Sequence, residues 1–187
     1  MARLFSIKPS IDFRGRQFKG LRGWAGKPLH PPLTDIPVAA YFLAAVFDLG
    51  SFVLGEESVA GRGRFVAASW ILLAGLVVSI PTTLTGFWDW LKSTQAHTQA
   101  WRTANWHMAV MLTVTALVVI DLLVRPSGDG ATADGATTIL SLLVGGLVSF
   151  GATYGGSLVF EYGFNVETSG DHPAWHESEK DVLPGAK

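Results

Sequence analysis

The sequence predicts an all-α membrane protein, a four-transmembrane-helix bundle with N-in/C-in topology. The first observation is composition, since 49% of the 187 residues are hydrophobic and 16% are charged. The mean hydropathy is +0.33. The second observation is that residues 65–88 and 135–160 contain no Asp, Glu, Lys or Arg. Each run exceeds the ~20 residues that a helix needs to cross ~30 Å of hydrocarbon. These features are not typical of a soluble domain.

The N-terminal segment, residues 1–29, is predicted to be a basic interfacial arm. It contains seven Lys or Arg residues, and Asp12 is its one acid. Apolar residues such as Trp24 are scattered among these charges, and several glycines argue against a continuous helix. Such a segment suits an anionic membrane face. A loosely ordered tail is the alternative. The segment lacks the apolar core of a signal peptide, so we treat it as mature sequence.

The first two spans are predicted at about 36–55 and 65–91. Thr34 or Asp35 can cap the first helix, and Pro37 suits its first turn. Pro81 lies inside the second span and should bend it, because a proline removes one backbone hydrogen bond. The aromatic stretch 86–91 resembles a helix that leaves the hydrocarbon.

The last two spans are predicted at about 105–124 and 137–162. The fourth is rich in glycine, and Gly151 with Gly155 forms a G-x-x-x-G pattern. Small residues at this spacing let helices approach closely, so we expect this helix to pack tightly. The three predicted segments are therefore the arm, a membrane domain over 30–166, and an acidic polar tail over 167–187.

The distribution of Lys and Arg predicts the orientation. Four spans place the arm, the second loop and the tail on one side of the bilayer, and eleven of the 14 basic residues lie there. Basic residues favour the cytoplasmic side of a membrane. We therefore expect a multi-pass protein of the plasma membrane with both termini in the cytoplasm.

The residues that could support chemistry gather at the cytoplasmic ends of the spans. His30 precedes the first span and His107 opens the third, so both are candidate haem or metal ligands. The alternative is a histidine that simply bonds a backbone carbonyl. His97 lies in a polar loop, where we expect it to be solvated, and no role is expected for the two histidines of the tail, His172 and His176.

Three carboxylates at the same end are predicted to support a ligating histidine from behind, namely Asp35, Asp89 and Glu161. Asp89 lies between Trp88 and Trp90, so it needs a donor such as an imidazole N–H or Arg102. The alternative for Asp89 and Glu161 is a carboxylate that marks the water boundary.

Two acids lie within the spans. Asp48 is about twelve residues into the first span, some ~18 Å along the helix. Asp121 lies at a comparable level of the third span and can pair with Arg125 one turn later. Asp48 can be protonated, hydrogen-bonded to Ser or Thr of another helix, or part of a proton path. Structural satisfaction is the preferred interpretation.

Three segments together resemble a known family. They are Gly-Lys-Pro-Leu-His-Pro-Pro-Leu-Thr-Asp-Ile-Pro-Val (26–38), Leu-Thr-Gly-Phe-Trp-Asp-Trp (84–90) and Gly-Gly-Ser-Leu-Val-Phe-Glu-Tyr-Gly-Phe-Asn-Val (155–166), with His107 between the last two. The pattern resembles the bacterial four-helix membrane proteins grouped as DUF2231, over about residues 24–166. The resemblance implies a bacterial inner membrane. It also implies membrane redox chemistry, since some members are fused to Rieske-type domains.

The resemblance also bears on the histidines. His30 and His107 fall on recurring histidine positions of the family. Many members carry a second histidine shortly after His-Pro, where this chain has Thr34 and Asp35. The resemblance therefore does not imply two haems here.

Three functions remain open. The first is an electron-transfer subunit that binds b-type haem, through His30 and His107, or a quinone. The second is a non-catalytic packing or assembly subunit of a larger membrane complex, and the third is a non-haem metal site that adds Asp89 or Glu161 to the histidines. The expected partners are lipid and other membrane subunits or copies of the chain, with no nucleic acid. We do not expect an enzyme on its own, and the absence of cysteine excludes thiolate sites.

Overall fold

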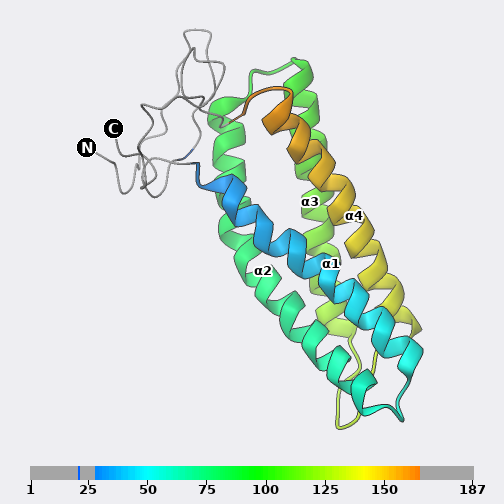
Figure 1. Ribbon diagram of the computed structural model, residues 1–187. Coiled ribbons are helices and arrows are strands. Elements are labelled where there is room, and N and C mark those ends of the chain that lie inside the picture. Colours follow the sequence, from blue (N-terminus) through cyan, green and yellow to red (C-terminus); the bar gives the residue numbers. More distant parts are fainter. Residues whose placement is uncertain (1–20, 22–27, 165–187) are drawn as a thin grey trace, which may run out of the picture.

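The computed structural model describes residue 21 and residues 28–164. Over these residues the chain forms four helices in sequence, as Figure 1 shows. They are α1 (His30–Leu54), α2 (Val59–Ser93), α3 (Gln99–Val124) and α4 (Gly135–Phe160). All four are long and apolar enough to cross a membrane, which confirms the predicted fold class. Most of the predicted arm, and the whole predicted tail, lie outside the described residues.

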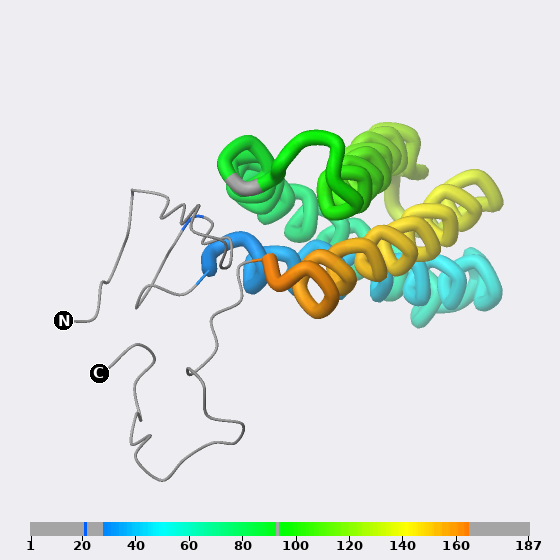
Figure 2. The backbone as a smooth tube through the Cα atoms, turned by 90° about the horizontal axis from the view of Figure 1, so that it is seen from above, coloured from blue at the N-terminus to red at the C-terminus, as the bar shows by residue number. Residues whose placement is uncertain are grey.

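The helices run alternately up and down, so the described ends of the chain lie at the same end of the bundle (Figure 1). Around the bundle the order is α2, α1, α4, α3, and Figure 2 shows α1 beside α4. The hairpins α1–α2 and α3–α4 are joined mainly through α1 and α4, while α2 touches α3 least. We call the end with His30 and His107 the histidine end, and the end with Arg125 the arginine end.

Every helix begins earlier than its predicted span. α2 starts at Val59 because the side chain of Ser58 accepts a hydrogen bond from the N–H of Gly61 at 3.1 Å. α3 starts at Gln99, where Thr98 accepts from the N–H of Trp101 at 3.1 Å. Hydropathy marks the part of a helix that lies in hydrocarbon, whereas the capping residue marks where the helix begins. The 35 residues of α2 therefore extend past the ~30 Å core at about 1.5 Å per residue.

The predicted cap of the first helix is wrong. α1 starts at His30 without any side-chain cap, so Thr34 and Asp35 lie inside it. Prolines at the second and third helical positions lack the N–H groups that a cap would satisfy, and they allow this early start. Pro37 consequently lies inside the helix rather than in its first turn.

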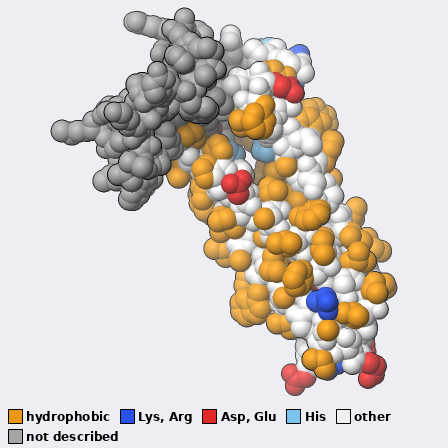
Figure 3. All heavy atoms as spheres, in the orientation of Figure 1, with side chains coloured by type: hydrophobic (Ala, Val, Ile, Leu, Met, Phe, Trp, Pro, Cys, Tyr) orange, Lys and Arg blue, Asp and Glu red, His pale blue; other side chains and the backbone are white. Residues whose placement is uncertain are grey.

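The core is built from small and branched side chains. One buried cluster includes Ala40 and Ala44 of α1, Ala68 and Leu72 of α2, and four valines of α3 and α4, namely Val114, Val118, Val144 and Val148. The hydroxyl of Tyr41 hydrogen-bonds the Ser79 hydroxyl at 2.7 Å within the first hairpin. Figure 3 shows the outer surface covered largely by hydrophobic side chains, as lipid contact requires.

The expected tight packing of α4 is confirmed on its face toward α3 and α1. A Cβ on Gly151 would lie 3.0 Å from the sulfur of Met111, and one on Gly145 would lie 2.9 Å from the Cβ of Ala45. Gly146, by contrast, has nothing within 4 Å of such a Cβ. Glycine therefore brings α4 close to two neighbours, while part of the helix stays open.

α2 changes direction in its upper half, as Figure 1 shows, in agreement with the bend expected at Pro81. The hydroxyls of Thr82 and Thr85 donate to carbonyls of the same helix, at Val78 and Pro81, over 2.8 Å each. The threonines that follow the proline thus bond the backbone of the bent region.

Candidate functional site

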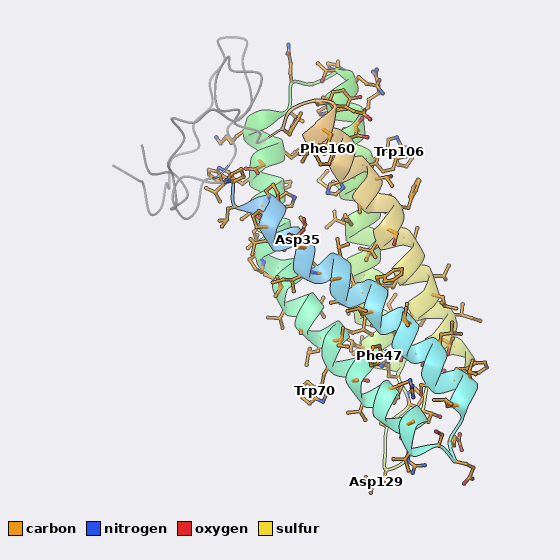
Figure 4. The ribbon with its side chains drawn as sticks, viewed as in Figure 1. Asp35, Phe47, Trp70, Trp106, Asp129 and Phe160 are labelled. Carbon is orange, nitrogen blue, oxygen red and sulfur yellow. The ribbon has the colours of Figure 1, made fainter. Side chains whose placement is uncertain are left out.

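The histidine end brings together one candidate residue from each helix. His30 is the first residue of α1, Asp89 lies near the end of α2, His107 lies in the third turn of α3, and Glu161 follows α4. Figure 4 labels Trp106 and Phe160 at this end, and Asp35 on the outside of α1. The topology therefore places the predicted residues at one end of the bundle.

His30 is held by the neighbouring helix α2. Its Nδ1 atom lies 3.0 Å from the carbonyl oxygen of Thr82 and 3.3 Å from the hydroxyl of Thr85. A carbonyl only accepts hydrogen bonds, so Nδ1 carries the proton and Nε2 carries the lone pair. Among the described residues, nothing hydrogen-bonds Nε2.

The imidazole of His30 rests directly on Gly86. A Cβ at that position would lie 2.5 Å from Cε1 of the ring, closer than real atoms approach. Only glycine leaves room for the ring in this place. Gly86 belongs to the 84–90 segment that resembles the family pattern, but the segment alone did not show what the glycine faces.

The position of His30 depends on a second contact between α1 and α2. Pro37 has no N–H, so the carbonyl of Leu33 lacks its usual partner in the helix. The hydroxyl of Thr82 lies 3.2 Å from this carbonyl across the interface and 2.8 Å from the Val78 carbonyl of its own helix, so its one hydrogen is shared between the two. Thr82 thus binds α1 twice, through its hydroxyl to Leu33 and through its carbonyl to His30.

His107 repeats this arrangement in the other hairpin. Its Nδ1 lies 2.9 Å from the carbonyl oxygen of Gly151 on α4, which again fixes the proton on Nδ1. A Cβ on Gly155 would lie 3.1 Å from Cε1 of the ring. Its Nε2 has no hydrogen-bond partner in the part of the chain that the structure describes.

The two hairpins therefore present two equivalent imidazoles. Each ring comes from the first helix of its hairpin, donates to a carbonyl of the second helix, and packs against a glycine there. Both residues are half-buried, and they lie close enough to interact electrostatically. Figure 3 shows histidine side chains in a hollow near the upper ends of the helices. A neutral imidazole that donates through Nδ1 has Nε2 available as a metal ligand.

The carboxylates are placed differently from the predicted supporting role. Oδ1 of the buried Asp89 accepts from the backbone N–H of Leu21 at 2.6 Å, and Arg102 instead bonds the side chain of Gln99 at 2.7 Å. Glu161 accepts from the hydroxyl of Ser157 at 3.2 Å, and Asp35 is exposed. Each imidazole has a backbone carbonyl behind it where a carboxylate was expected.

The predicted non-haem metal site would need three ligands in one place. Within residues 28–164, no three His, Asp or Glu side chains come together closely enough to hold a metal ion. His97 lies in the α2–α3 turn with a positive φ of 67°, and its ring packs beside Trp101 at 5.8 Å between centroids. Within residues 28–164, none of the contacts of His97 involves His30 or His107.

The intramembrane acids meet at the arginine end. The guanidinium of Arg125 contacts both, at 2.5 Å from Oδ1 of Asp48 and 3.3 Å from Oδ1 of Asp121. The pairing of Asp121 with Arg125 one turn later is thereby confirmed. The hydroxyl of Ser141 on α4 contacts both carboxylates as well, so Asp48 is hydrogen-bonded to a serine of another helix.

Comparisons with known proteins give one match. The sequence pattern of a family described as predicted membrane protein (DUF2231) matches residues 26–168, which is most of the chain. No curated protein and no solved structure matches. The matched range includes His30 and His107 as well as the two acids at the arginine end, Asp48 and Asp121.

Proposed function

Since the chain belongs to the DUF2231 family of predicted membrane proteins, we propose that it acts within the bilayer as an electron-transfer subunit that binds one b-type haem. The paired imidazoles of His30 and His107 carry this proposal. Two neutral histidines from opposite hairpins form the donor set of a bis-histidine haem, and haem sites of this kind are built between helices. The haem would supply one-electron redox chemistry, while the two residues would hold its iron.

The proton positions favour haem over quinone. A quinone carbonyl accepts hydrogen bonds, so its site needs donors. Nε2 of His30 and of His107 is an acceptor, because Nδ1 of each ring is already the donor to a carbonyl. An Nε2 lone pair suits iron instead.

The placement of the site argues for a subunit rather than a complete electron carrier. Both histidines lie at one end of the bundle, so one haem there does not reach the opposite membrane face. An electron must therefore pass to or from a partner at the histidine end. The excess of basic residues on this side predicts that it faces the cytoplasm.

An absorption spectrum of the purified protein tests the proposal. The detergent-solubilised protein, expressed with a haem supply, should show a Soret band and the sharp reduced bands of low-spin haem after dithionite. His30→Ala and His107→Ala should each lose the low-spin spectrum. His97→Ala is the matched control, because this histidine lies in the α2–α3 turn, and it should keep the wild-type spectrum.

A colourless protein that takes up no added haemin would overturn the haem proposal. It would favour the second candidate, a non-catalytic assembly subunit of a larger membrane complex. The open position at Gly146 supports that alternative, because a small residue with free space allows close approach of another helix. Copurification of a stoichiometric membrane partner would then be expected.

A further inference from the structure

The buried cluster at the arginine end has an unequal charge count. It consists of Asp48 from α1, Asp121 from α3, Arg125 directly after α3, and Ser141 from α4, and both carboxylates are fully buried. One guanidinium balances only one ionised carboxylate. An unbalanced charge at membrane depth is costly, so the cluster needs one more positive charge or one fewer negative charge.

The hydrogen bonds at Ser141 show where a proton fits. Its oxygen contacts Oδ2 of Asp48, and it lies 2.9 Å from Oδ2 of Asp121. A hydroxyl has one hydrogen, so it donates to one carboxylate only. The other contact is favourable only if that carboxyl group itself carries a proton and donates to the serine oxygen.

The contacts of Arg125 favour one arrangement. Its two terminal nitrogens lie 2.5 and 3.0 Å from the two oxygens of Asp48, one nitrogen to each oxygen. Asp121 is contacted by only one of these nitrogens, which lies 3.3 and 3.4 Å from its two oxygens. The forked ion pair therefore belongs to Asp48. In this arrangement Asp121 donates to Ser141, and Ser141 donates to the ionised Asp48.

A surface pocket lies beside the cluster. It is lined in part by Phe65 and Ser69, which both contact Arg125.

The charged groups that face the pair are few. Arg125 interacts with both acids, and Asp134, which caps α4 beyond Thr137, interacts electrostatically with Asp121. α2 contributes the Ser69 hydroxyl and the Phe65 ring. Asp134 is exposed. Its carboxyl group accepts a hydrogen bond from the backbone N–H of Thr137, and this bond lowers the pKa of the carboxyl group. It therefore stays ionised at neutral pH and adds a negative charge near Asp121 rather than the missing positive one.

We propose that Asp48 and Asp121 share one exchangeable proton, which makes the arginine end of the bundle a proton-binding site. The proton links α1 to α3 and α4 through Ser141, so it joins the two hairpins. Loss of the proton leaves one uncompensated negative charge at their junction and weakens it. Because the folded protein holds a proton that the unfolded chain releases, stability falls as the pH rises.

Infrared spectroscopy tests the proton directly. At neutral pH the wild-type protein in detergent should show the C=O stretch of a protonated carboxyl group, and this band should shift in D2O. Asp48→Asn and Asp121→Asn each leave one carboxylate paired with Arg125, so each variant should lose the band. Asp35→Asn is the matched control, since this acid is exposed on the same helix as Asp48, and it should keep the band.

Thermal unfolding against pH gives the second measurement. The wild-type melting temperature should fall from neutral to alkaline pH, and Asp121→Asn should flatten this fall. A wild-type protein without a protonated carboxyl band would overturn the proposal even if a variant failed to fold. A band that survives both substitutions would overturn it as well, because the proton would then belong to another group.

Discussion

At the scale of the residue, the two imidazoles of the histidine end fit because two glycines have no Cβ atom. Gly86 and Gly155 give the imidazoles of His30 and His107 the space that a Cβ would fill. The carbonyls of Thr82 and Gly151 then determine that the proton of each ring is on Nδ1. The chemistry of these rings is therefore determined by the partner helix of each hairpin rather than by the residues next to them in the sequence.

Gly86→Ala should displace the imidazole of His30, since the new Cβ would lie 2.5 Å from Cε1. We expect it to lower the free energy of unfolding by about 1–3 kcal/mol, the usual cost of overpacking. Thermal unfolding in detergent measures this. Gly63→Ala is the control on the same helix, because nothing lies within 4 Å of its Cβ, and it should be neutral or stabilising. Equal melting temperatures of the two variants would contradict this account.

At the scale of the element, α1 is a helix that begins with prolines and contains another. The first two prolines replace a cap, while Pro37 frees the carbonyl of Leu33 inside the bundle. The hydroxyl of Thr82 on α2 shares its hydrogen between this carbonyl and that of Val78. The carbonyl that Pro37 leaves unpaired in α1 thus gives α1 a hydrogen-bond contact with α2. The same threonine positions His30.

Thr82→Val should cost about 1 kcal/mol, the net value of a typical hydrogen bond. The cost should be smaller in a Pro37→Ala background, where the restored N–H bonds the Leu33 carbonyl within the helix. Chemical or thermal unfolding of the four proteins in this cycle measures the coupling. Thr83→Val, at an exposed neighbouring position, should have little effect in either background. An equal cost of Thr82→Val in both backgrounds would show that the Leu33 contact does not contribute.

At the scale of the molecule, two hairpins meet along α1 and α4 and carry a different kind of polar site at each end. The histidine end offers two neutral imidazoles, and the arginine end buries two acids and one guanidinium. Four apolar helices place these sites near opposite faces of a bilayer. The basic residues predict which face is cytoplasmic, and this prediction is open to direct test.

Labelling of single cysteines tests the orientation, because the chain has no cysteine of its own. Ser127→Cys, in the α3–α4 loop, should react with a membrane-impermeant maleimide in intact cells, since this loop is predicted to face outward. Gln95→Cys, in the α2–α3 turn, should react only after the cells are permeabilised. The reverse pattern would show an inverted topology.

The fold could be predicted further than the site. Long apolar runs are a direct physical requirement for crossing hydrocarbon, so four spans followed from the residues alone, two of them without any charge in their central stretch. The expected cap at Thr34 or Asp35 was wrong because an early start on prolines needs no side-chain cap. Carboxylates were expected to bond the imidazoles. In the structure the bonds are made by backbone carbonyls instead, from Thr82 in the bent helix and from Gly151 in the glycine-rich helix.

By itself the sequence determined the four crossings, the gathering of the histidines at one end, and the pairing of Asp121 with Arg125. All of these depend on hydropathy or on spacing along one helix. Only the tertiary structure decided that Thr82 and Gly151 hold the imidazoles, and that Asp48 joins Arg125 and Ser141. The reason is that contacts between helices depend on how each helix is rotated and tilted against its neighbours. That arrangement is set by packing across the whole bundle rather than by any one segment.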